Sequence, residues 1–180
     1  MARQMQFRES SHEAFLLLHN LQGLLTKLEE TTYATDAGIS YQQFLVLITV
    51  ESSEPPVNQT TVAKAIQRNL NSISMIIDRM EKLGLVTRER SKDDRRETHL
   101  IVTALGRKKL AKAIQVGVAL EERLGSALTE QELQDGMRLM VKIRNQVLKE
   151  MGREPIALAI ERPTRKRVLD VLRRGVTSSR

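Results

Sequence analysis

One continuous stretch, Gln59–Leu110, constrains the fold more than any other part of this 180-residue chain. Two short helical patterns separated by a turn run directly into a basic β-hairpin, Arg88–Thr103. Its arms, Leu85–Arg90 and Thr98–Thr103, are predicted to be strands, and the hairpin that they form is named the wing. The tip between them carries Lys92, Asp93, Asp94, Arg95 and Arg96. A helix that fits a major groove, followed by a ribbon whose arginines can reach a minor groove, is typical of proteins that read duplex DNA.

Composition limits the other classes of protein to which the chain could belong. Only 3% of residues are aromatic and there is no Trp, so the core must be aliphatic, which favours helix packing on helix. Zero Cys excludes a disulfide framework and a thiolate metal site. The chain has no apolar run near the ~18 residues of a membrane span and no secretory signal pattern, so we expect a cytoplasmic protein.

The chain also lacks the residue patterns of an enzyme. It has no nucleophile–base motif and no Gly-rich phosphate loop, and two histidines on one helix without a carboxylate cluster make a poor metal site. We therefore expect no catalytic residues, no bound metal and no cofactor.

The net charge of +7 is unevenly distributed along the chain. Residues 68–112 carry 12 Lys and Arg against 6 Asp and Glu, and residues 153–180 carry 8 against 3. Residues 1–67, by contrast, carry 4 against 7. A localised basic patch over the hairpin segment is the electrostatic footprint of a protein that binds a nucleic-acid duplex.

Apolar periodicity and capping residues predict six helices. Their approximate bounds are Ser10–Thr32, Tyr41–Ser52, Thr60–Ile66, Leu70–Leu83, Ala104–Gly125 and Glu130–Met151. The expected N-caps, in the same order, are Ser10 or Ser11, Ser40, Asn58 or Thr60, Asn69, Thr103 and Thr129. The first helix has a wide apolar stripe from Phe15 to Leu28, which indicates that a second subunit covers it.

The residues from Asp78 to Leu110 resemble the winged helix-turn-helix regulators of the MarR type. The tip Asp94-Arg95-Arg96 matches the family, and Val102-Thr103-Ala104-Leu105-Gly106 matches its Leu-Thr-x-x-Gly with Val in place of Leu. The resemblance covers about residues 10–150, although the first and last helices match only in pattern. The fold class expected is mainly α, with about six helices and a two-stranded wing.

The resemblance implies a homodimer with two functional parts. A MarR-like domain would span residues 1–152, with residues 10–33 and 104–152 as dimerisation helices and residues 40–103 as the DNA-binding lobe. In such proteins a small-molecule pocket often lies where the two parts meet. Most members of the family are repressors.

The recognition helix is expected to present its first turns to base edges. The candidate base-contacting residues are Leu70, Asn71, Ser72, Ser74 and Met75. Asn71 can pair with adenine and Met75 or Leu70 can contact a thymine methyl, while no arginine is placed to read guanine, so we expect an A·T-rich half-site. Ile73, Ile76, Ile77 and Met80 are spaced to face the core. Asn69 is interpreted as a helix cap rather than a base reader.

Phosphate and minor-groove contacts are expected from the basic residues around this helix. Arg96 is predicted to enter the minor groove, because narrow A·T tracts concentrate negative potential that attracts a guanidinium. The family's Asp-x-Arg tip maps Asp94 to the role of holding an arginine or the turn backbone. The predicted phosphate contacts are Lys64, Arg68, Arg79, Arg88, Arg90, Lys92 and Arg95.

A small aromatic or phenolic effector is the ligand class that the resemblance implies. The candidate lining residues are His12, Phe15, His19, Tyr33, Tyr41 and Phe44. His12 and His19 lie two turns apart on one helical face and could bind an anion or respond to pH. The alternative is that both are surface or hydrogen-bonded histidines.

Residues 153–180 form a basic C-terminal extension that departs from the family pattern. Pro163 can start a helix in which Arg165, Lys166 and Arg167 precede aliphatic residues. Three interpretations stay open: an added helix that embraces the dimer, an additional contact to the DNA backbone, or a disordered basic tail.

The sequence therefore predicts a homodimeric, sequence-specific regulator that binds a pseudo-palindromic double-stranded operator, most simply a repressor released by a small-molecule effector. The alternative is a non-specific architectural nucleic-acid-binding protein without a ligand switch. An architectural or RNA-binding protein would be expected to spread its basic charge widely or to present aromatic stacking platforms, and this chain shows neither pattern.

Overall fold

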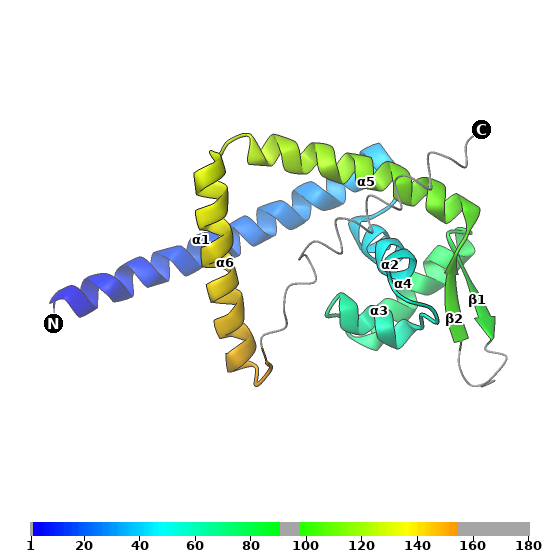
Figure 1. The fold of residues 1–180 in the computed structure, drawn as a ribbon, viewed down its shortest axis with the longest axis horizontal. Coiled ribbons are helices and arrows are strands. Elements are labelled where there is room, and N and C mark those ends of the chain that lie inside the picture. Colours follow the sequence, from blue (N-terminus) through cyan, green and yellow to red (C-terminus); the bar gives the residue numbers. More distant parts are fainter. Residues whose placement is uncertain (1, 91–97, 155–180) are drawn as a thin grey trace.

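The computed structural model describes residues 2–90 and 98–154 and is mainly helical. The elements in chain order are α1 (Ala2–Thr32), the π-helical segment η1 (Tyr33–Ala37), α2 (Tyr41–Ser52), α3 (Gln59–Ala65), α4 (Leu70–Lys82), β1 (Val86–Arg90), β2 (Thr98–Val102), α5 (Ala104–Gly125) and α6 (Glu130–Glu150). Figure 1 shows α2, α3, α4 and the two strands gathered beneath one end of α5, while α1 and α6 extend away from them. The predicted mainly α, winged helix-turn-helix class is confirmed.

Five helices begin at a capping residue that the sequence predicted. Side-chain oxygens of Ser40, Asn58, Asn69, Thr103 and Thr129 each accept a hydrogen bond from the backbone N–H three residues further on. For Asn69 the acceptor is Oδ1, 2.8 Å from the backbone N of Ser72, so its amide oxygen is engaged at the start of the recognition helix α4. These caps satisfy N–H groups that a helix terminus leaves without a partner.

The predicted start of the first helix is wrong. Helix α1 begins at Ala2, so Ser10 and Ser11 lie inside it and do not cap it. The residues that precede Ser10 include Arg, Gln, Met and Glu, which have high helix propensity, and neither Gly nor Pro occurs among them. Nothing in that stretch therefore ends the helix before it reaches the serines.

A closed aliphatic core holds α2, α3, α4 and the sheet together. Its fully buried residues include Val46, Leu47, Val62, Ile73, Ile77, Met80, Val86, Val102 and Leu110. Of the four core positions predicted on α4, Ile73, Ile77 and Met80 are buried, and Ile76 is partly buried against the same cluster. Helix α5 contributes Leu110, Ala113 and Ile114 from its first half, so this half joins the lobe to the rest of the chain.

The wing is an antiparallel pair in which Val86 lies opposite Val102 and Arg90 opposite Thr98. Leu85 N donates to Met80 O at 2.9 Å and ties the base of the wing to α4, while Thr103 N donates to Leu85 O at 3.1 Å and joins the two arms there. On the other edge of β2, Leu100 N donates to Val57 O at 2.8 Å. The strands therefore leave the lobe in a defined direction.

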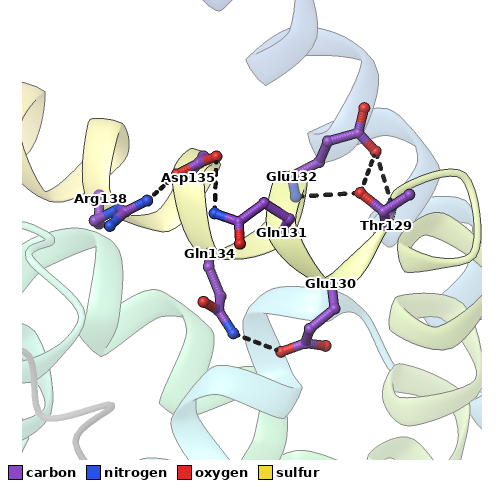
Figure 2. Close-up of polar contacts among 7 residues, drawn as sticks. All are labelled: Thr129, Glu130, Gln131, Glu132, Gln134, Asp135 and Arg138. Atoms are coloured by element: carbon purple, nitrogen blue, oxygen red, sulfur yellow. Dashed lines mark hydrogen bonds and ion pairs between the residues drawn. The ribbon is translucent and has the colours of Figure 1, made fainter.

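Helix α6 is stabilised by polar contacts that are local to it (Figure 2). Thr129 and Glu132 form the predicted capping box, in which Thr129 N donates to Glu132 Oε2 at 2.8 Å and Glu132 N donates to Thr129 Oγ1 at 3.3 Å. Further along, Gln131 donates to Asp135 at 3.1 Å, and Arg138 pairs with the same carboxylate. Each of these contacts joins residues of one helix or its cap, so they support the helix itself.

The apolar faces of the long helices are open to solvent in the single chain. On α1 the exposed side chains are Phe15, Leu16, Leu17, Leu18, Leu21, Leu24 and Leu28, and on α6 they are Leu133, Met137, Leu139, Met140, Ile143 and Val147. A surface cavity of about 540 Å³ between these helices is lined by Phe15, Lys142, Ile143, Gln146, Val147, Glu150 and Met151. Soluble monomers rarely expose contiguous apolar patches of this kind.

Candidate nucleic-acid interface

The turn between α3 and α4 orients the recognition helix. Gln67 adopts a left-handed conformation with φ of 54°, and Arg68 N donates to Ala63 O at 3.0 Å to close the turn. Asn69 then caps α4 with its side chain. Leu70 and Asn71 in the first turn of α4 are exposed, while Ile73 and Ile77 anchor another face of the helix in the core.

All five predicted base-contacting residues lie on the accessible part of α4. Leu70, Asn71 and Met75 are exposed, and Ser72 and Ser74 are half-buried. Met75 is 58% exposed and Leu70 is 47% exposed, so neither side chain is buried in the core. Their exposure leaves both free to contact the methyl groups and edges of bases.

Four of the predicted phosphate-contacting residues are exposed around this helix. They are Lys64 on α3, Arg68 in the turn, Arg79 on α4 and Arg90 at the end of β1. These basic residues lie on α4 or on the turn, helix and strand that precede or follow it in the chain. The predicted wing-tip residues Lys92, Asp94, Arg95 and Arg96 lie outside the described residues.

Arg88 has a different environment from the other predicted phosphate contacts. Its Nη2 lies 2.6 Å from Asp78 Oδ1, and its Nη1 pairs with Glu81 Oε2. With the Gln59 amide oxygen turned toward it, that oxygen accepts from Nη2 at 2.9 Å and from Nε at 3.2 Å. Burial lowers the pKa of Arg88, but the hydrogen bonds to both carboxylates outweigh burial and raise it above its ordinary value. The guanidinium is therefore engaged within the protein.

Sequence reasoning did not single out Gln59, Asp78 and Glu81 as partners of Arg88. The signal available was the strand period of two, which places Arg88 on the same face of β1 as the buried Val86. Asp78 and Glu81, three residues apart on α4, share one helical face. Only the angle between strand and helix reveals that these faces meet.

Three of the six predicted effector-lining residues come together at the end of α1. The rings of Tyr33, Tyr41 and Phe44 form a cluster, with centroids 5.1 Å apart for Tyr33–Tyr41, 4.8 Å for Tyr33–Phe44 and 6.0 Å for Tyr41–Phe44. Tyr33 is only 4% exposed and packs against Gly117 of α5, where an added Cβ would lie 2.4 Å from the tyrosine Oη. The cluster thus joins η1, α2 and α5.

Acidic side chains surround this aromatic cluster and were missed by sequence reasoning. Burial raises the pKa of Glu29, a hydrogen bond from Tyr41 lowers it, and the nearby charge of Glu121 raises it further. Burial also raises the pKa values of Tyr33 and Tyr41, with Glu29 and Glu121 adding to both shifts. Tyr33 and Tyr41 are therefore neutral hydrogen-bonding groups at any physiological pH.

The structure does not bring His12, Phe15 and His19 to the aromatic cluster. All three are exposed along α1, and His19 Nδ1 donates to the backbone O of Phe15 at 2.7 Å. Fourteen residues of straight helix separate His19 from Tyr33, a span of about 21 Å at ~1.5 Å per residue. Within a single chain, then, these six residues do not form one pocket.

Two further properties concern the described ranges, 2–90 and 98–154. In them, no three or more His, Asp or Glu side chains are grouped so as to hold a metal ion. No helix in the same ranges has the length and apolar character required to span a membrane.

Comparison with known proteins identifies relatives of this chain. The profile of the MarR family matches residues 39–98. The transcriptional regulator HosA of Escherichia coli is 31% identical over 94 residues, which cover 52% of this chain and 70% of HosA. The HTH-type transcriptional regulator MgrA of Staphylococcus aureus is 33% identical over 86 residues, which cover 48% of this chain and 58% of MgrA. These relatives are transcriptional regulators and not enzymes.

Solved structures share the fold over a longer part of the chain. FabT of Streptococcus pneumoniae, solved in complex with DNA, superimposes with a TM-score of 0.67 and 20% identity. The match covers 78% of this chain and 99% of FabT. A match of this length extends beyond the lobe and includes residues of the long helices.

Proposed function

The chain belongs to the MarR family of transcriptional regulators, and we propose that it is a homodimeric cytoplasmic repressor of a pseudo-palindromic operator. The observation that carries this proposal is the two-sided recognition helix. One face of α4 is locked in the core by Ile73, Ile77 and Met80, and the other presents polar and apolar side chains among basic residues. A helix held in this way can enter a major groove without losing its own packing.

Base reading is assigned to the first turns of α4. Asn71 can donate to and accept from adenine, Ser72 or Ser74 can bond bases or phosphates, and Leu70 or Met75 can meet a thymine methyl. None of these side chains offers the bidentate donor pair that selects guanine. The proposed half-site is accordingly A·T-rich.

The wing is assigned to the minor groove and the flanking backbone. Arg96 is proposed to insert where an A·T tract narrows the groove, and Asp94 to order the tip before binding. Lys64, Arg68, Arg79, Arg90, Lys92 and Arg95 are proposed phosphate contacts. Each would contribute to the salt dependence of binding.

A homodimer is supported by the uncovered apolar faces of α1 and α6. Leu17 and Leu24 on α1 and Met140 on α6 are each more than half exposed in the single chain. A second copy of the same surface would bury these residues and close the cavity beside Phe15. In this arrangement two α4 helices would lie about one duplex turn apart.

The proposed switch is release of the operator by a small aromatic or phenolic effector. The support for it is the cluster of Tyr33, Tyr41 and Phe44, which joins the lobe to the long helices. A ligand that bound a lobe spacing unfit for DNA would release the operator by population shift. His12, Phe15 and His19 lie away from this cluster in a single chain, so they would line the same pocket only as residues of the second protomer.

The test is binding of the purified protein to the DNA immediately upstream of its own gene. Fluorescence anisotropy at fixed salt would compare the wild type with Arg96→Ala, on native and scrambled half-sites. We expect sequence-dependent binding that the substitution weakens by about 1–3 kcal/mol. Binding that is indifferent to sequence, with Arg96→Ala no worse than the loss of any other charge, would favour an architectural nucleic-acid-binding protein instead.

A further inference from the structure

Arg88 is the one described basic residue of the wing whose charge is turned inward. Its side chain is 21% exposed, whereas its partners Asp78 and Glu81 are 54% and 40% exposed. Its guanidinium touches α4 through both carboxylates and α3 through the Gln59 amide. One side chain of β1 therefore contacts both helices of the helix-turn-helix.

These contacts account for most of the hydrogen-bonding capacity of the guanidinium. Arginine has five N–H donors in a fixed planar fork, and Nη1, Nη2 and Nε of Arg88 all have partners within the protein. Two carboxylates against one guanidinium also leave the cluster with a net negative charge. Such a cluster cannot attract a phosphate backbone.

The position of the cluster explains what it can do instead. Backbone bonds from Leu85 and Thr103 fix the base of the wing, and the bond from Leu100 N to Val57 O holds the outer edge of β2. Arg88 lies opposite Leu100, and its side chain holds β1 at the same level of the hairpin. A planar fork held by two carboxylates on α4 restrains the angle at which β1 leaves that helix. The direction of the wing then decides where its arginine-bearing tip meets the duplex.

We propose that Arg88 is a positioning residue, which sets the wing against the recognition helix through Asp78, Glu81 and Gln59. This inference rests on the proposed function and revises the expected phosphate contact at Arg88. Asp78 and Glu81 become determinants of specific DNA binding although they are acidic residues on a DNA-reading surface. Their contribution is to keep major-groove and minor-groove reading in register.

The double variant Asp78→Asn/Glu81→Gln separates positioning from charge by the sign of its effect. Removing two negative charges beside a polyanion should strengthen binding if electrostatics alone acts. The positioning proposal expects the opposite for the specific duplex, with affinity falling about tenfold, the loss that corresponds to ~1.4 kcal/mol. On a scrambled duplex the same variant should bind as well as or better than the wild type.

Arg88→Lys supplies the complementary comparison, because it keeps the charge and loses the planar fork. We expect it to lose specific affinity to the same degree as Arg88→Ala. The salt slope of both should match the wild type, whereas loss of a phosphate contact in Arg88→Ala would reduce that slope by about one. Glu51→Gln is the matched control, since Glu51 pairs with Arg107 at 3.1 Å outside the junction of wing and helix.

Hydrogen exchange of the free full-length protein provides a readout that needs no operator. Amides of β1 and β2 should exchange faster in Arg88→Ala and in the double variant than in the wild type or Glu51→Gln. If the wild type fails to distinguish the specific duplex from the scrambled one, the proposed function fails, and exchange alone still tests the restraint on the wing. Unchanged exchange in both variants, or tighter specific binding by Asp78→Asn/Glu81→Gln, would overturn the assignment of Arg88.

Discussion

The lobe buries its apolar side chains within one chain, whereas the long helices α1 and α6 leave theirs exposed. In the lobe, Leu47, Ile73 and Ile77 are completely buried by contacts between elements of one chain. Along α1 and α6, Leu17 is 68% exposed and Met140 is 60% exposed, although their spacing is equally regular. Periodicity alone therefore shows which face of a helix is apolar, and does not show whether the covering surface belongs to the same molecule.

The difference extends to polar contacts. In the lobe, Arg88 of β1 pairs with Asp78 of α4, and Glu51 of α2 pairs with Arg107 at the start of α5, so each pair joins two elements. On α6 the contacts of Thr129 with Glu132 and of Asp135 with Arg138 stay within one helix and its cap (Figure 2). The lobe is held by contacts between its elements, while these contacts on α6 support that helix alone and its apolar side chains stay exposed in the single chain.

The largest expected effect tests whether the free energy of unfolding comes from contacts within one chain or from contacts between the chains of the proposed dimer. Ile77→Ala should reduce the free energy of unfolding by about 2–5 kcal/mol, because it opens a cavity in a closed core. Leu17→Ala should cost less than about 0.5 kcal/mol at protein concentrations where the chain is monomeric. Urea unfolding of both variants at low and high protein concentration measures how much free energy of unfolding each substitution removes.

Concentration is the control in that experiment. The loss for Ile77→Ala should persist at every concentration, whereas the loss for Leu17→Ala should grow as the wild type becomes dimeric. An equally large loss for both variants in dilute protein would mean that α1 is buried within a single chain, and the contrast between the two regions would not hold.

The features that sequence predicted correctly depend on few neighbours along the chain. The caps at Ser40, Asn69 and Thr103 need only a side chain and an amide three residues away, so local chemistry decides them. The predicted start of α1 was wrong, because Ser10 is a good capping residue but the residues before it are good helix formers. A capping residue predicts a boundary only where something also stops the helix.

Helix periodicity predicted which site residues are exposed. It could not predict contacts between side chains of different elements. The open and buried faces of α4 were both predicted from spacing. The contacts of Arg88 were not predicted, because its partners Asp78 and Glu81 lie ten and seven residues away on another element. His19 was grouped with Tyr33, although a straight helix carries the two far apart.

A smaller effect tests how tightly the long helix α5 is joined to the lobe. Gly117→Ala should destabilise the protein by about 1–3 kcal/mol, because the new Cβ would lie 2.4 Å from Tyr33 Oη and that buried ring cannot withdraw easily. Combined with Tyr33→Phe, which removes that oxygen, the alanine should instead recover up to ~1 kcal/mol of helix propensity. Thermal unfolding of the two single variants and the double variant measures the coupling.

Gly136→Ala on α6 is the matched control for this comparison. An added Cβ at Gly136 meets nothing within 4 Å in the single chain, so the substitution should be neutral or stabilising. If Gly117→Ala behaved like Gly136→Ala, Tyr33 would have room to move, and the aromatic cluster would not hold α5 firmly.

The smallest expected effect contrasts the acid–base behaviour of the two regions. Burial raises the pKa of Glu29 above its ordinary 4.5, so its contribution to stability is complete below 4.5 and is lost as pH rises through the raised value. The N–H of Thr129 lowers the pKa of Glu132, so its contribution is present above 4.5 and is lost as pH falls through the lowered value. Glutamine substitution at each position removes the titrating group and keeps a side chain of the same shape.

Urea unfolding midpoints between about pH 3 and pH 7 measure how the stability contributions of Glu29 and Glu132 change with pH. Glu29→Gln should raise the midpoint toward neutral pH relative to the wild type and leave it unchanged in acid. Glu132→Gln should retain the capping hydrogen bonds and lose only the gain that the wild type shows above pH 4.5. A falling midpoint for Glu29→Gln at neutral pH would show that the hydrogen bond from Tyr41 outweighs burial and the charge of Glu121. The charged carboxylate would then be a stabilising part of the junction between lobe and long helices.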